Sequence, residues 1–200
     1  KELFSIAEGN IRRNYDKMST LLKQAIDQIE HAKNHVDGVS GVPSGFAELD
    51  RITSGWQKSD LIIIAARPGM GKTAFTLSMA RNIAVDFNTP VAIFSLEMSS
   101  IQLVNRLIAS EAEIASDKLR KGNLADHEYQ QLHARITKLA EAPLFIDDTP
   151  ALSIFELRAK CRRLKAQHNV ELIIVDYLQL MTSSGEGKNS NREQEISNIC

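Results

Sequence analysis

The chain has 200 residues, and its 43% hydrophobic content suits one sizeable buried core. Its 24 basic and 25 acidic residues nearly cancel, which argues against a histone-like protein that binds nucleic acid through overall charge alone. Two cysteines without a CxxC pair argue against zinc, and no stretch reaches the roughly 18 apolar residues of a membrane span. We therefore expect a cytoplasmic protein that does not enter a membrane.

The two ends of the sequence suggest a piece of a longer protein. Residue 1 is Lys rather than Met, and residues 191–200 have the pattern of an opening helix with no stop signal after it. We therefore expect the chain to be cut at its C-terminal end.

Residues 17–33 are the first predicted element, an amphipathic helix. Apolar residues recur there at steps of three and four, at Met18, Leu21, Leu22, Ala25, Ile26, Ile29 and Ala32. The Gly-, Ser- and Pro-containing stretch that follows indicates a linker. The helix could pack on its own domain or dock on a neighbouring subunit. We assign residues 1–37 to this helix and linker, and residues 38–200 to a second domain.

Strand and helix patterns alternate through the second domain. Near-continuous apolar runs at 60–66, 90–97 and 170–177, with a shorter one at 143–147, predict strands of a parallel sheet buried on both faces. Helical patterns separate them, at 71–85, from Ser99 onward, at 125–140 and at 153–168. Capping boxes mark two helix starts, Ser99 with Gln102 and Ser153 with Glu156. The prediction is an α/β fold with a doubly wound, mostly parallel sheet, followed by a polar loop at 183–191.

The stretch ARPGMGKT, residues 66–73, predicts a phosphate-binding loop between the first strand and its helix. The usual pattern is G-x-x-x-x-G-K-[ST], and Ala66 replaces its first glycine. Lys72 would contact the β and γ phosphates, and the Thr73 hydroxyl would bind Mg²⁺. The residues expected around the nucleotide are Arg67, Pro68, Gly69, Met70, Gly71, Lys72, Thr73 and Ala74.

Two carboxylates close other predicted strands and are candidates for the same site. Asp176 ends the run LIIVD, where a parallel strand reaches the ligand-binding edge, so we expect it to hold Mg²⁺; it could also only cap the strand. Glu97 closes VAIFSLE and is the candidate base for the attacking water. Alternatively, Glu97 could favour the positive end of the helix that begins near Ser99.

Two further charged groups have a less specific interpretation. Asp147 and Asp148 precede a helix within DDTP, which is usually a turn, and they are weaker candidates for a role in the site. The basic cluster of Arg158, Lys160, Arg162, Arg163 and Lys165 lies opposite apolar residues at helical spacing. It therefore indicates the solvated face of an amphipathic helix rather than a nucleic-acid patch.

Together these motifs resemble one family. The stretches ARPGMGKT, FSLEMSSIQLVNRL and IIVDYLQLM, and the G-x-x-x-L-D turn within GVPSGFAELD, are similar to the ATPase domain of the hexameric replicative DNA helicases of bacteria, the DnaB family. Ala66 matches the family's usual form. Residues 3–30 are similar to the family's linker helix, so the resemblance covers nearly the whole chain.

The resemblance implies a RecA-like P-loop ATPase in a ring of six subunits. ATP with Mg²⁺ would lie between neighbours, and central loops would translocate on single-stranded DNA to unwind the duplex at a replication fork. The linker helix would dock on the next subunit, and a primase and a helicase loader would be partners. Lys72 and Thr73 would bind phosphate and metal, Asp176 would be the Walker B acid and Glu97 the catalytic glutamate.

The resemblance also implies that an N-terminal domain, DNA-contacting loops and an arginine finger lie outside this sequence. An arginine finger contributes about 10³–10⁵ in rate, so we expect the isolated chain to hydrolyse ATP poorly. Two alternatives remain open: a recombinase or clock-type RecA-like ATPase that does not unwind duplexes, and a non-catalytic oligomerisation or loader-binding module.

Overall fold

The computed structural model describes residues 17–33 and 38–181. Contacts divide the chain into two compact units, residues 1–40 and 41–200. Within the described residues, no helix has both the length and the apolar character needed to cross a bilayer. The elements are α2 (Met18–Lys33), α3 (Ala47–Thr53), α4 (Lys72–Arg81), the π-helix η1 (Asn82–Asp86), β1 (Val91–Ser95), α5 (Ser100–Ala112), α6 (Ser116–Lys121), α7 (Asp126–Glu141), β2 (Leu144–Asp147), α8 (Ile154–His168), β3 (Leu172–Asp176) and the 3-10 turn η2 (Leu178–Leu180).

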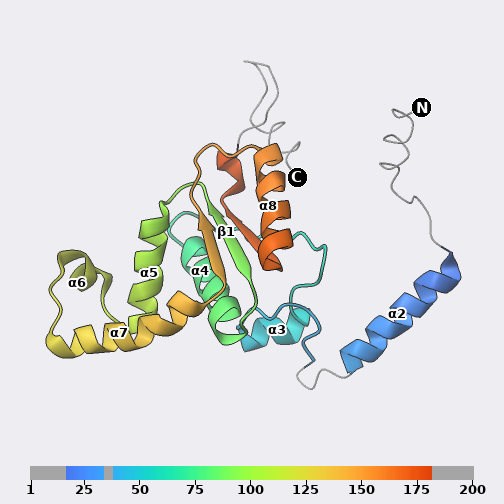
Figure 1. Ribbon diagram of the computed structural model, residues 1–200, viewed down its shortest axis with the longest axis horizontal. Coiled ribbons are helices and arrows are strands. Elements are labelled where there is room, and N and C mark those ends of the chain that lie inside the picture. The colour runs from blue at the N-terminus through green and yellow to red at the C-terminus, as the bar shows by residue number, and fades with distance from the viewer. Residues whose placement is uncertain (1–16, 34–37, 182–200) are drawn as a thin grey trace, which may run out of the picture. The chain divides into compact units, whose positions relative to one another are not determined.

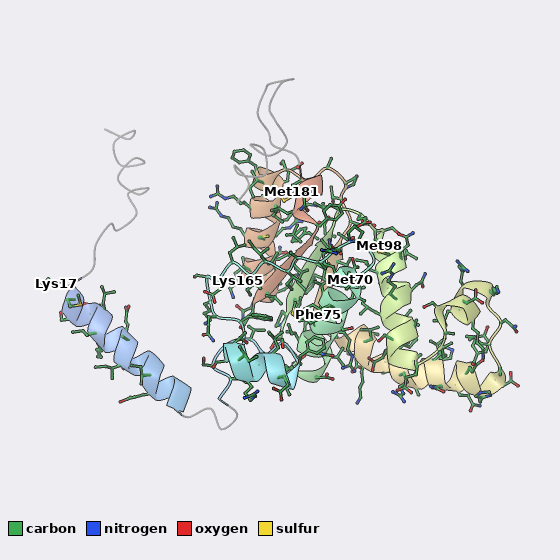
Figure 2. The ribbon with its side chains drawn as sticks, turned by 180° about the vertical axis from the view of Figure 1, so that it is seen from behind. Lys17, Met70, Phe75, Met98, Lys165 and Met181 are labelled. Atoms are coloured by element: carbon green, nitrogen blue, oxygen red, sulfur yellow. The ribbon has the colours of Figure 1, made fainter. Side chains whose placement is uncertain are left out.

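The first unit contains α2, which confirms the helix predicted at 17–33. Its apolar side chains are exposed (Figure 2), with between 43% and 69% of their surface accessible at Met18, Leu21, Leu22, Ile26 and Ile29. The helix therefore carries an apolar stripe along one side.

The second unit is built on a parallel sheet with the strand order β2-β1-β3. Val91 of β1 lies opposite Leu144 on one side and Leu172 on the other, and Ser95 lies opposite Asp176. The strands predicted at 90–97, 143–147 and 170–177 are thus confirmed. Because successive strands lie on opposite sides of β1, the strand order reverses there, and the carboxyl edge next to such a reversal is where ligands bind in doubly wound folds.

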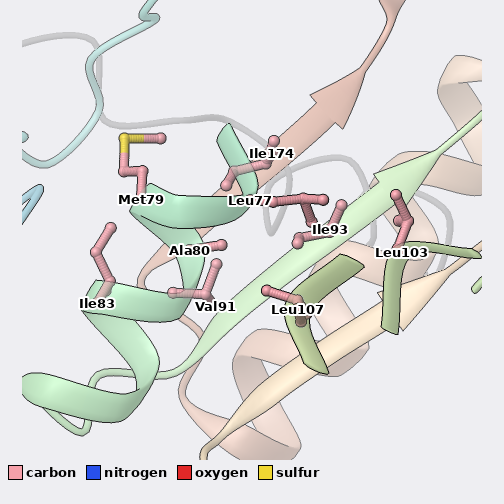
Figure 3. Packing of buried hydrophobic residues seen from close by; sticks show 9 residues of the cluster. All are labelled: Leu77, Met79, Ala80, Ile83, Val91, Ile93, Leu103, Leu107 and Ile174. Carbon is pink, nitrogen blue, oxygen red and sulfur yellow. The ribbon is translucent and has the colours of Figure 1, made fainter. Parts of the chain in front are cut away.

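Helices cover both faces of the sheet, with α4 and α5 on one side and α8 on the other (Figure 1). Val91 and Ile93 of β1 pack among buried residues of α4 and α5 (Figure 3), while Ala92 and Phe94 face α8. On α8, three of the predicted apolar residues pack against that second cluster, namely Leu157, Cys161 and Leu164. Most of the basic cluster on α8 is exposed, as the amphipathic interpretation predicts.

The strand predicted at 60–66 is wrong for the described residues. The segment 61–67 has no regular secondary structure, and Leu61 and Ile63 are 75% and 77% exposed. Only Ile64 packs against the core. The apolar run has the composition of a buried strand, but a strand also requires a neighbour to hydrogen-bond with. Among the described residues, β3 is paired with β1 alone, and no strand pairs with 61–67.

The turn before this segment is organised by a buried acid. Asp50, 7% exposed, accepts the backbone N–H groups of Ser44 at 2.7 Å and Gly45 at 3.1 Å. Gly45 has φ +78°, and a Cβ there would clash with the Asn82 side chain, so glycine is required for both reasons. These contacts explain the G-x-x-x-L-D pattern, because its first and last residues close one turn.

The helix starts marked by capping boxes are also confirmed. Ser99 and Ser153 each accept a backbone N–H from the residue three positions on, and the side chains of Gln102 and Glu156 return the bond. The helix predicted at 71–85 consists of α4 continued by η1. The polar loop predicted at 183–191 and the helix opening at 191–200 lie outside the described residues.

Candidate nucleotide-binding site

The loop of residues 67–71 forms an exposed turn that leads directly into α4. The backbone N–H of Met70 donates to the carbonyl of Arg67 at 3.1 Å, and residues 67 to 71 are all exposed. Gly69 and Gly71 have φ values of +77° and +89°, and a Cβ at either position would have open space around it. Glycine is therefore required in this loop by backbone conformation, because L-residues rarely adopt such angles.

The first turn of α4 presents backbone donors toward the loop. Gly71 precedes the helix and accepts the N–H of Phe75 at 2.9 Å, the first bond of the helix. The N–H groups of Lys72, Thr73 and Ala74 therefore have no helical acceptor, and the positive end of the helix dipole lies among them. An open loop before such a helix start is a suitable cradle for phosphate.

Asp176 joins the two side chains at the start of α4. Its Oδ1 lies 2.8 Å from Lys72 Nζ, and its Oδ2 accepts the Thr73 hydroxyl at 2.7 Å. The Asp176 side chain is 9% exposed and that of Lys72 is 27% exposed. Thr73 and Asp176 are 103 positions apart in sequence, so the sheet, and not local sequence, brings these groups together.

Tyr177 is a neighbour of this cluster that the sequence patterns did not identify. Lys72 Nζ lies 4.3 Å from the centroid of its ring, which is within the range of a cation–π interaction. The available signal was its position directly after the last residue of the strand that ends at Asp176.

Glu97 lies at the same edge of the sheet. The Leu96 N–H donates to the Asp176 carbonyl at 2.8 Å, so the chain just before Glu97 runs beside the end of β3. Because β1 ends at Ser95, Glu97 lies in the turn after the strand and is exposed, whereas the sequence placed it as the closing residue of the strand. The structure thus joins Lys72, Thr73 and Asp176 by direct contact, and it brings Glu97 to the edge that they share.

The two weaker candidates make contacts away from this cluster. Asp147 pairs with Lys160 of α8 at 2.6 Å; burial raises the pKa of Asp147, but hydrogen bonds from Lys160 and Thr149 outweigh it and leave the pKa lowered. Asp148 accepts the backbone N–H of Ser100 at 2.7 Å, and this bond lowers its pKa. Neither carboxylate makes a described contact with Lys72 or Thr73.

The chemistry of the donor set fits a nucleotide with a divalent cation. A hydroxyl and a carboxylate are oxygen ligands of the kind that Mg²⁺ prefers. An ammonium group and free backbone donors lie beside them, and these groups bind phosphate oxygens. The positively charged and negatively charged halves of a magnesium nucleotide therefore each have suitable partners among Lys72, Thr73 and Asp176.

Comparison with known families agrees with this arrangement. The model of the DnaB-like helicase C-terminal domain matches residues 41–200, which is most of the chain. The chain belongs to this family. The resemblance inferred from the motifs is therefore confirmed.

Relatives of this DnaB-family chain are replicative helicases that are much longer. It is 48% identical to the replicative DNA helicase DnaB of Rhodothermus marinus over 99% of its own length and 21% of the relative. It is 43% identical to the replicative DNA helicase DnaC of Bacillus subtilis and 44% identical to DnaB of Geobacillus stearothermophilus, over 100% of its own length in both cases. It spans 44% of each of these two relatives.

Two solved structures share the fold. One is an isolated ATPase domain, which superposes with a TM-score of 0.83 and 32% identity, over 93% of this chain and 65% of that one. The other, a DnaB-like replicative helicase described with its interactions with primase, has a TM-score of 0.77 and 31% identity, over 99% of this chain and 47% of that one. The DnaB-family chain therefore has the RecA-like α/β fold predicted from its strand–helix alternation.

Proposed function

We propose that this chain is the linker helix and RecA-like ATPase part of a hexameric replicative DNA helicase. The helicase would use ATP to translocate on single-stranded DNA and unwind the duplex. The observation that carries the proposal is the contact of Asp176 with both Lys72 and Thr73 at the start of α4. In this proposal residues 1–37 form the linker helix and tether, and residues 38–200 form the ATPase core.

Each group at the site has a role in this reaction. The loop residues 67–71 and the N–H groups at the start of α4 hold the phosphates, with Lys72 on the β and γ phosphates. Thr73 and Asp176 hold Mg²⁺, which neutralises charge on the phosphate oxygens during transfer. Glu97 orients the attacking water and accepts its proton, because it is an exposed carboxylate at the same sheet edge.

The groups that would bind nucleotide and metal also contact one another. Asp176 holds both the Lys72 ammonium and the Thr73 hydroxyl. A phosphate that takes Lys72 therefore frees one carboxylate oxygen of Asp176 at the position where a cation would bind. Nucleotide and metal binding are expected to favour each other for this reason.

The partners follow from the exposed stripe of α2 and from the relatives. Five large apolar side chains on one short exposed helix favour docking on another protein surface, and we propose the neighbouring subunit of a ring. Single-stranded DNA, a primase and a helicase loader complete the proposed assembly, and the interactions with primase described for one structural relative support the second of these. We propose a cytoplasmic location.

The experiment is a pair of substitutions in the full-length helicase that contains this chain. Lys72→Ala should abolish ATP turnover and unwinding while leaving the fold intact. Glu97→Gln should lower ATP turnover by about 10²–10⁴-fold, the usual contribution of a general base, and leave nucleotide affinity nearly unchanged. Lys165→Ala, an exposed lysine on α8 (Figure 2), is the matched control and should retain activity.

Two outcomes would contradict the proposal. Unwinding that survives Lys72→Ala would remove the nucleotide site, and turnover that survives Glu97→Gln would remove the catalytic glutamate. ATP turnover without strand displacement in the intact helicase would instead favour a recombinase-type ATPase. The 200-residue chain alone should turn over ATP far more slowly, since a missing arginine finger costs about 10³–10⁵ in rate.

A further inference from the structure

The turn that carries Glu97 is closed on one side by Ser95. The Ser95 hydroxyl donates to the Met98 carbonyl at 2.7 Å and accepts the Met98 N–H at 3.2 Å. Ser95 is only 2% exposed, so its side chain is held by the surrounding core. The two bonds span Glu97 and fix the distance between the residues on either side of it.

The other side of the turn is held by Asp148. Its Oδ2 accepts the backbone N–H of Ser100 at 2.7 Å, and 48 positions separate the two residues. Ser100 is the first residue of α5 and lies three positions after Glu97. A carboxylate also interacts favourably with the positive end of the helix dipole, which strengthens this contact.

Asp148 is itself fixed in place by its neighbours. Lys160 of α8 contacts Asp147 at 2.6 Å and donates to the Thr149 hydroxyl at 2.7 Å, and the Thr149 N–H donates to Asp147 at 3.0 Å. The residues on both sides of Asp148 are thus anchored to a helix on the opposite face of the sheet from α5. Its carboxylate is presented to Ser100 from a rigid position.

Glu97 depends on this framework because its own side chain is exposed and makes no described hydrogen bond. A catalytic group must be held within a fraction of an ångström, and a misplacement of about 1 Å can reduce the rate about 10²-fold. Hydrogen bonds to the backbone on either side of Glu97 are the contacts that can supply this constraint.

We propose that Asp148 is a positioning residue for Glu97, acting through the Ser100 N–H at the start of α5. Together with Ser95 it holds the turn at both ends, so that the Glu97 carboxylate stays at the sheet edge beside Asp176. This inference rests on the catalytic role proposed above for Glu97.

The test uses the full-length helicase with substitutions at Asp148. Asp148→Ala should lower the kcat for ATP by about 10- to 100-fold and leave nucleotide affinity, measured with a fluorescent ADP analogue, within about twofold. Asp148→Asn should recover most of the loss, because an amide oxygen still accepts the Ser100 N–H. The control is Glu128→Ala, since Glu128 likewise accepts a backbone N–H, that of Ala125, at the start of α7.

A double substitution separates positioning from general weakening of the fold. In a Glu97→Gln background, Asp148→Ala should cause no further loss of turnover, because the group that it positions has been removed. A further loss of about 10-fold in that background, a parallel loss of nucleotide affinity, or an equal loss in Glu128→Ala would overturn the inference. If Glu97→Gln alone retained turnover, the proposed catalytic role would fail first, and this result is distinguishable from failure of Asp148 alone.

Discussion

The ion pair between Lys72 and Asp176 should contribute measurably to the stability of the nucleotide-free chain. Lys72→Met keeps the length of the side chain but removes the charge that faces a carboxylate only 9% exposed. Asp176→Asn removes the other charge and keeps an oxygen that can accept the Thr73 hydroxyl. The double substitution completes a thermodynamic cycle that isolates the coupling between the two groups.

The size of this coupling follows from the geometry. At the observed 2.8 Å and an effective dielectric constant of about 20, the Coulomb attraction is about 6 kcal/mol. Desolvation of both groups and about 2 kcal/mol of lysine side-chain entropy oppose it. We therefore expect a net coupling free energy of about 1–3 kcal/mol, the usual range for groups in direct contact.

Urea unfolding of the four proteins in nucleotide-free buffer measures the coupling. The control is the same cycle on Arg51 and Glu48, an ion pair with side chains 73% and 81% exposed, for which we expect less than about 0.5 kcal/mol. A coupling below about 0.3 kcal/mol between Lys72 and Asp176 would refute the reasoning, because the effects of the two substitutions would then simply add. The exchange of Lys72 from Asp176 to phosphate would lose its basis.

Two further predictions concern the linker helix and a second ion pair. Ile26→Glu on the exposed stripe of α2 should dissociate the full-length ring, as seen by light scattering, whereas Gln24→Glu on the polar side should not; an intact ring with Ile26→Glu would contradict the docking role. Arg81 contacts Glu111 at 2.6 Å, and its hydrogen bond and charge lower the pKa of that 9%-exposed carboxyl below 4.5. The stabilisation is therefore present above about pH 4.5 and is lost as the pH falls through the lowered pKa. Glu111→Gln should cost about 1–3 kcal/mol at about pH 7 and progressively less in acid, and Asp86→Asn at the exposed end of the same arginine less than about 1 kcal/mol, by urea unfolding; a pH-independent difference would contradict this assignment.

The sequence alone predicted the elements that depend on short-range interactions. The capping boxes at Ser99 and Ser153 join residues three positions apart, and the periodicity of α2 and α8 spans only a few turns. The phosphate loop could be predicted for the same reason, because its turn and the helix start are neighbours in the sequence. Such patterns are complete within the window in which they are read.

The prediction of a strand at 60–66 was wrong for a related reason. Its apolar composition is local information, but pairing requires a partner strand whose position the run itself does not specify. Likewise, the pattern at Asp147 and Asp148 indicated only a turn. Their bonds to Lys160 and Ser100 depend on how α8 and α5 pack on the sheet.

What the sequence determined by itself was the set of chemical groups and the order of the helices and strands. Only the tertiary structure decided which groups meet: Asp176 with Thr73 across 103 positions, and Asp148 with Ser100 across 48. The physical reason is that helices and caps form between neighbours along the backbone. Contacts between distant residues follow from strand register and from the burial of both sheet faces, which involve the whole domain at once.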